Sequence, residues 1–157
     1  MRSIEKAIHA HGDMVYRLAM ANLRSVSDAE DVFQEVFLRL AQHEAPFESD
    51  EHEKAWLIRV TVNCARSMWR QWKCRIIAQT AQGTAVPFVS PEESQVDEAL
   101  SRLPAKYRTV IHLHYYEGYT AEEIARMLSQ HPSTIRTQMT RARRMLGKML
   151  KEEEFDV

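Results

Sequence analysis

Apolar residues recur every three or four positions along most of the chain, the spacing of one buried face on an α-helix. The first such pattern spans residues 4–23. A second spans residues 27–40, where Ser27 and Glu30 fit a capping box and mark the expected helix start. A third runs from about 53 to 75. The chain is therefore predicted to open with helices.

The periodicity fails between about residues 79 and 94. Gly83, Pro87 and Pro91 interrupt it there, and small and polar residues dominate. This composition is typical of an interdomain linker. The predicted organisation is a first domain over 1–76, a linker over 77–95, a second domain over 96–151 and an acidic tail over 152–157.

The second domain is predicted to contain a helix-turn-helix. Gly118 suits the C-terminal cap of the helix that precedes this motif. Thr120 and Glu123 then form another capping box, which starts a short helix. After a turn at 129–131, Pro132 suits the first turn of the next helix. A short helix, a tight turn and a second helix make up this motif.

Composition supports an all-α protein of two small helical domains. The 157 residues include only 4 glycines and 5 prolines, and no alternating β-branched runs occur. No stretch approaches the roughly 20 apolar residues of a membrane span, and the N-terminus has no apolar secretory core. We therefore expect a cytoplasmic protein without membrane insertion. Cys64 and Cys74 lie about 15 Å apart along one predicted helix, too far for a disulfide.

No motif predicts catalysis, a cofactor or a metal site. A phosphate-binding loop, a nucleophile elbow and an H-E-x-x-H motif are all missing from the sequence. The pairs His9 with His11 and His112 with His114 are two residues apart, so their side chains point about 200° away from each other on a helix. No acid or cysteine completes either set. We expect a protein that is not an enzyme and needs no cofactor.

The net charge of −1, from 21 basic and 22 acidic residues, hides an uneven distribution. Between residues 54 and 75 there is no acid, and five polar side chains fall within about an 80° sector of the predicted helix. Like charges at this spacing repel by a few tenths of a kcal/mol per pair, which favours an external anion over a merely solvated face. This basic face comprises Arg59, Asn63, Arg66, Arg70 and Lys73. Trp56 lies beside it, either packed or as a stacking surface for an unpaired base.

The exposed side of the predicted helix after Pro132 carries short polar and cationic side chains. Arginine can donate two hydrogen bonds to guanine, and serine and threonine can reach bases or phosphates. The alternative is an ordinary solvated helix. This recognition face comprises Ser133, Thr134, Arg136, Thr137, Thr140, Arg141 and Arg144.

The outer side of the 27–40 helix has a different character, because it combines acids, an amide and one apolar anchor. Such a surface can dock a protein partner through charge and a single apolar contact, although amphipathic helices also carry solvated acids. This acidic face comprises Asp31, Gln34, Glu35 and Leu38.

Several segments resemble extracytoplasmic-function (ECF) sigma factors of bacterial RNA polymerase. DAEDVFQEVFLRL at 28–40 and WLIRV at 56–60, followed by Asn63, resemble region 2 of that family, while LPAKYR at 103–108, YTAEEIA at 119–125 and TRARRML at 140–146 look like its region 4. These segments occur in the expected order and extend over nearly the whole chain except the linker. Departures from the family pattern occur at Ser67, Ser129 and Ser133, and in a linker that has almost no charge before Glu92.

The resemblance implies an alternative sigma factor that binds core RNA polymerase and directs promoter recognition and transcription initiation. It implies that the acidic face contacts the β′ clamp helices. The basic face and Trp56, with the loop at 47–53, would engage the opened minus-10 element, and the recognition face would read the minus-35 element. Region 4 would also touch the β flap, and an anti-sigma factor is a further implied partner.

Two other hypotheses remain open from the residues. A stand-alone helix-turn-helix regulator would bind duplex DNA without polymerase, its first domain serving dimerisation or effector binding. A sigma-like adaptor would bind polymerase without any preference for promoter sequence.

Overall fold

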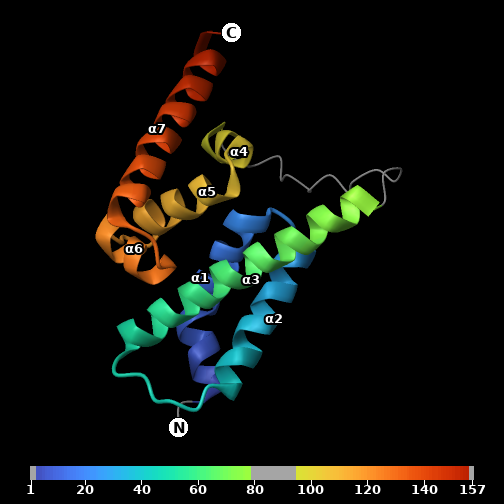
Figure 1. Cartoon of the computed structure of the whole chain (residues 1–157), viewed down its shortest axis with the longest axis vertical. Helices are drawn as coiled ribbons and strands as arrows, with labels where there is room; N and C mark the ends of the chain where they lie inside the picture. Colours follow the sequence, from blue (N-terminus) through green and yellow to red (C-terminus); the bar gives the residue numbers. More distant parts are fainter. Residues whose placement is uncertain (1–2, 79–94, 156–157) are drawn as a thin grey trace. The chain divides into compact units, whose positions relative to one another are not determined.

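The computed structural model of the chain describes residues 3–78 and 95–155, with side chains for all of these except 69, 72–78, 95–98 and 152–155. Every regular element in these two ranges is helical (Figure 1). The prediction of an all-α fold with two helical domains is therefore confirmed. The predicted linker, apart from its ends, lies outside the described residues, and so does the side chain of Lys73.

The first compact unit is built from α1 (Ile4–Leu23), α2 (Val26–Gln42) and α3 (Asp50–Ala78). Each of these helices packs against the other two (Figure 1). The apolar stripes predicted from the sequence form the core, where Leu18, Val36 and Ile58 are completely buried. Burial of these stripes orients the remaining face of each helix outward.

The start of α2 differs from the prediction, and the capping box of Ser27 with Glu30 is wrong. Ser25 is the N-cap, and its Oγ accepts a hydrogen bond from the Asp28 N–H at 3.3 Å. The cause lies in the preceding residue. Arg24 has a left-handed backbone with φ 54°, and its N–H donates to the Met20 carbonyl at 2.9 Å. This turn ends α1 so abruptly that α2 already begins at Val26.

The second compact unit contains α4 (Gln95–Arg102), α5 (Ala105–Ile111), a π-helical turn η1 (His112–Tyr116), α6 (Ala121–Leu128) and α7 (Pro132–Phe155). Helix α7 packs against α4, α5 and α6. Its buried side contributes Ile135, Met139 and Ala142 to the core, and Ala142 meets Leu103 and Tyr107 there. Packing on three helices fixes which side of α7 is exposed.

The predicted helix ends of this unit are present. Gly118 has φ +77°, and the next N–H, that of Tyr119, donates back to the Leu113 carbonyl at 3.0 Å. The Glu123 N–H donates to Thr120 Oγ1 at 3.2 Å, and the Thr120 N–H donates to Glu123 Oε1 at 3.1 Å. The bond from the Thr120 N–H lowers the pKa of Glu123, because it favours the ionised carboxylate. The capping box of Thr120 with Glu123 is therefore confirmed.

Replacing Ser129 with glycine should stabilise the second unit. Ser129 ends α6 with φ 55°, a left-handed conformation that costs a residue with a Cβ about 1 kcal/mol. We expect the free energy of unfolding of this unit to rise by about 0.5–1 kcal/mol, measured by hydrogen exchange of the α6 and α7 amides. Ser129→Ala keeps the Cβ and should give no increase; an equal rise in both variants would contradict the backbone explanation.

Candidate protein and nucleic-acid interfaces

The acidic face lies on the outer side of α2. Its members are all exposed, and the apolar side chain of Leu38 is 58% exposed. On the opposite side of the helix, Val32 and Val36 are buried in the core. An exposed leucine among acids and an amide therefore does not contribute to the fold of this unit, and it is available to a partner.

Glu35 also has a neighbour on its own helix. The Nε of Arg39 donates to Glu35 Oε1 at 2.9 Å, and this hydrogen bond raises the pKa of Arg39. Both side chains are 50% exposed, so such a pair contributes only about 0.3–0.5 kcal/mol. The carboxylate of Glu35 can exchange this neighbour for a cation on a partner at little cost.

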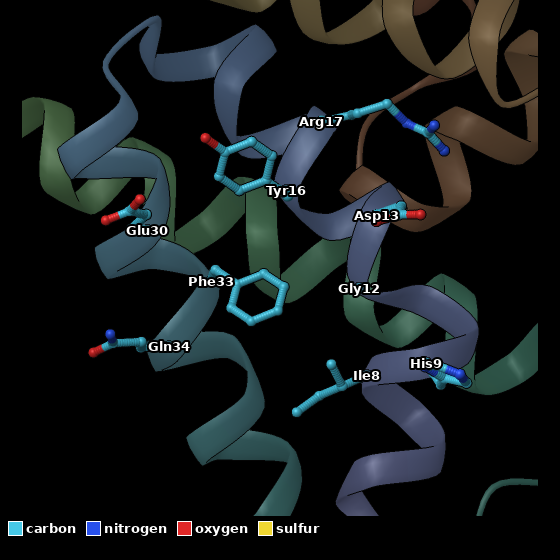
Figure 2. Close-up of a pocket in the computed structure, with 9 residues that line it drawn as sticks. All are labelled: Ile8, His9, Gly12, Asp13, Tyr16, Arg17, Glu30, Phe33 and Gln34. Carbon is cyan, nitrogen blue, oxygen red and sulfur yellow. The ribbon is translucent and has the colours of Figure 1, made fainter.

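A cavity of about 810 Å³ lies between α1 and α2 beside the acidic face (Figure 2). Gln34 of that face lines it, together with Glu30 and Phe33 of α2. Tyr16 reaches into the same space from α1, and Figure 2 shows its ring and that of Phe33 between the two helices. The contribution of α1 to this cavity was not predictable from the spacing, because Tyr16 falls at the edge of the apolar stripe of its helix.

The basic face runs along α3. Arg59, Asn63 and Arg70 are exposed, and Arg66 is half-buried. The opposite side of the helix, which includes Ile58, is buried. Among the side chains that the structure describes, these three arginines form no ion pair with an acid. The arginines of the predicted face are therefore not neutralised by acids, as far as its side chains are described.

Trp56 belongs to an aromatic cluster at the junction of α2 and α3. The ring of Phe47 stacks on His43 with centroids 4.6 Å apart, and Trp56 meets both rings edge-on at 5.7 and 4.9 Å. His52 contacts Phe47 on another side at 5.4 Å. Trp56 is half-buried, so its ring is packed and still partly accessible. The family resemblance implied a loop at 47–53, but residues 50–53 are already the first turn of α3. Nothing in the sequence indicated the contact with His43.

The recognition face lies on the exposed side of α7, and every member of it is exposed. Two of its hydroxyls are already engaged locally. Ser133 Oγ lies 2.7 Å from His131 Nδ1, which also accepts the Ser133 N–H at the start of the helix. Thr140 Oγ1 donates to the Arg136 carbonyl at 3.0 Å. The side chains of Thr134, Thr137, Arg141 and Arg144 have no partner among the described residues and are available to a ligand.

Two arginines of α7 contact residues outside their own helix. Arg136 Nη1 donates to Glu122 Oε1 of α6 at 2.7 Å, and both side chains are 57% exposed. Arg143 Nε donates to the Tyr115 hydroxyl at 2.7 Å. These pairs are 14 and 28 residues apart in the sequence, so helical spacing could not indicate them. Exposed ion pairs typically contribute about 0.2–1 kcal/mol.

No group of three or more histidine, cysteine, aspartate or glutamate side chains in the described part of the chain is placed to hold a metal ion. Of the helices that the structure describes, none has the length and apolarity needed to cross a membrane. Cys64 is buried, which raises the pKa of its thiol.

Comparison with known protein families gave two matches along this chain. Residues 7–73 match the family model described as Sigma-70 region 2, and residues 93–146 match that described as Sigma-70, region 4. The acidic and basic faces fall inside the first match, and the recognition face falls inside the second. The two matches are in the same order as the two compact units.

Similar proteins were also found. The RNA polymerase sigma factor SigV of Bacillus subtilis (strain 168) is 27% identical, and the alignment covers 92% of this chain and 89% of SigV. The ECF RNA polymerase sigma factor SigE of Mycolicibacterium smegmatis is 31% identical, over 93% of this chain and 61% of SigE.

A solved structure has a similar fold. It is that of the sigma factor RpoE in complex with the anti-sigma factor NepR from Bartonella quintana. The TM-score is 0.74 at 23% identity, and the match covers 94% of this chain and 96% of RpoE.

Proposed function

The chain belongs to the sigma-70 family of RNA polymerase sigma factors, and we propose how its three exposed faces divide the work of an alternative sigma factor. An ECF sigma factor binds core RNA polymerase and directs it to promoters for transcription initiation. Within this role we assign region 2 to residues 1–76, the linker to 77–95, region 4 to 96–151 and an acidic tail to 152–157.

The acidic face of α2 binds the β′ clamp helices of core polymerase. Its exposed carboxylates, Asp31 and Glu35, attract a basic partner surface and set its register. Leu38 supplies an apolar anchor of the kind that contributes strongly to binding when a partner buries it. This assignment is supported by the combination of exposed acids with an exposed leucine on one helix.

The basic face of α3 and the adjoining aromatic cluster hold the opened minus-10 element. Arg59, Arg66 and Arg70 are not neutralised by acids among the described residues, so phosphates can supply the missing negative charge. The partly accessible ring of Trp56, next to Phe47, offers a surface on which an unpaired base can stack. Cations with an aromatic ring are the usual combination for binding a single strand.

The recognition face of α7 reads the minus-35 element in the major groove. Its side chains project from the exposed side of α7, whose other side packs on α4, α5 and α6. With α6 and the turn at Ser129, α7 forms a helix-turn-helix. Arg136 and Arg141 can read guanine, while Arg144 lies further along the helix and can contact phosphate. The β flap is the expected polymerase contact of region 4.

We infer that an anti-sigma factor regulates this chain. The inference is supported by RpoE, a sigma factor of similar fold whose structure was solved in complex with an anti-sigma factor. The protein acts in the cytoplasm, where RNA polymerase is found, and carries out no catalysis of its own.

The main support for this proposal is the arrangement of the three faces. The basic face and the recognition face lie on separate units, and the unit with the basic face also bears the acidic face. Gel filtration of the chain with purified core polymerase tests it. Co-elution with core, followed by retention of promoter DNA on the complex, is expected. A stable homodimer that binds palindromic DNA without core would favour the regulator, and co-elution without sequence preference would favour the adaptor.

Replacing Leu38 with alanine should weaken binding to core polymerase about tenfold, the loss typical of an apolar anchor in an interface. The free energy of unfolding should change by less than about 0.5 kcal/mol, because the side chain is exposed. Titration of core with labelled chain measures the affinity. Val26→Ala is the matched control, since Val26 is 50% exposed at the start of the same helix. Equal losses of affinity in both variants would show that the loss is not specific to Leu38, and that Leu38 is not an anchor of the interface.

A further inference from the structure

Glu122 is an acid placed beside a surface that is otherwise suited to nucleic acid. It lies in the first turn of α6 and accepts a hydrogen bond from Arg136 Nη1 at 2.7 Å, across the turn of the helix-turn-helix. Both side chains are 57% exposed. The contact therefore joins two solvent-accessible groups and leaves the core of the unit untouched.

Glu122 suits the helix end on which it lies. It is in the first turn of α6, near the positive end of that helix dipole, where an anion is favourable. Arg136 lies in the second turn of α7, where the helix dipole has little effect on a charge. The carboxylate is therefore stabilised by its own helix and meets the guanidinium through one hydrogen bond.

We propose that Glu122 determines promoter specificity by positioning Arg136 for a base and opposing its transfer to a phosphate. This inference rests on the proposed role of Arg136 in reading the minus-35 element. Arginine has five N–H donors, so a bond to Glu122 leaves donors for the edge of a guanine. A guanidinium held on one side loses less rotamer freedom when it binds a base. The negative charge of Glu122 also repels the phosphate backbone, which reduces sequence-independent binding.

The test uses the complete holoenzyme, formed from the full chain and core polymerase of its source. The probe is a promoter library whose upstream duplex is randomised around the minus-35 position, and bound DNA is sequenced. The variants are Glu122→Gln, Arg136→Ala and both together. Glu123→Gln is the control, because it removes the same charge one residue away and glutamine can still complete the capping box with Thr120.

We expect Arg136→Ala to flatten base preference at one position, and Glu122→Gln to reduce preference at that same position by about three- to tenfold. The double variant should resemble Arg136→Ala there, and Glu123→Gln should resemble the unmodified chain. If Arg136→Ala flattens a position that Glu122→Gln leaves intact, the role of Glu122 is overturned. If Arg136→Ala changes no position, the proposed role of Arg136 fails, and the role of Glu122 fails with it.

Discussion

Replacing Arg136 with alanine should weaken binding of the holoenzyme to its cognate promoter by about 1–3 kcal/mol, or about 5- to 150-fold. A bidentate contact from arginine to guanine has this value, and its loss should relax the preference for that base pair. Arg136 is exposed on α7, and its hydrogen bond to Glu122 leaves its other N–H donors for the base. Equilibrium binding to the cognate duplex and to a version scrambled at the minus-35 element measures the effect.

Arg144 provides the comparison on the same helix. It lies two turns further along α7 and is exposed without a partner among the described residues. Arg144→Ala should weaken cognate and scrambled DNA alike and lower the salt dependence by about one counterion, as expected for a phosphate contact. Equal losses on both DNAs for Arg136→Ala would show that the reading face lies elsewhere on α7.

Reversing the charge of Asp31 and Glu35 together should abolish co-elution with core polymerase. Both carboxylates are on the exposed side of α2, and disrupting a buried charge pair at an interface typically costs about 2–5 kcal/mol. The expected loss of affinity is therefore about 30-fold or more. Glu35→Lys also places a cation next to Arg39, which should cost only a few tenths of a kcal/mol in helix stability.

A second double variant separates this effect from a general change of charge. Glu44→Lys with Glu48→Lys alters the net charge of the chain by the same amount, in the exposed segment between α2 and α3. Measured without DNA, it should still co-elute with core. Loss of binding in both double variants would indicate that long-range electrostatics, not direct contact, is responsible. If both double variants still bound core, the acidic face would not be the interface.

The helices and their buried sides could be predicted from the sequence, because apolar spacing alone decides which residues meet in the core. Once the buried sides are assigned, the outer sides of α2, α3 and α7 are the faces that remain. Their members lie at the surface, exposed or half-buried, wherever their side chains are described. Helix ends were predictable where a local motif was complete, as with Thr120 and Glu123. The start of α2 was not predictable, because Arg24 adopts a left-handed conformation that is uncommon for arginine.

Contacts between elements were the part that the sequence could not indicate. The pairing of Glu122 with Arg136 depends on how α6 and α7 pack, and the packing of Trp56 against His43 depends on the path of the chain after α2. The π-helical turn at His112–Tyr116 could not be predicted either, because its residues also fit the periodicity of an ordinary α-helix. The local rules cover a single helix, whereas these contacts arise where two segments meet.

The net charge of −1 is now explained by position rather than by total. Cations are concentrated on the basic face of α3 and the recognition face of α7, whereas acids are frequent on α2, at the start of α3 and in the C-terminal tail. A chain of this balance attracts DNA only weakly by itself, so that promoter binding depends on the polymerase.

Run-off transcription with purified core polymerase tests the central claim most directly. The templates are promoter-containing fragments of the source genome, each transcribed with core alone and with core plus the chain. We predict discrete transcripts from a subset of fragments only when the chain is present. If no fragment is transcribed above the level of core alone, the chain does not act as a sigma factor.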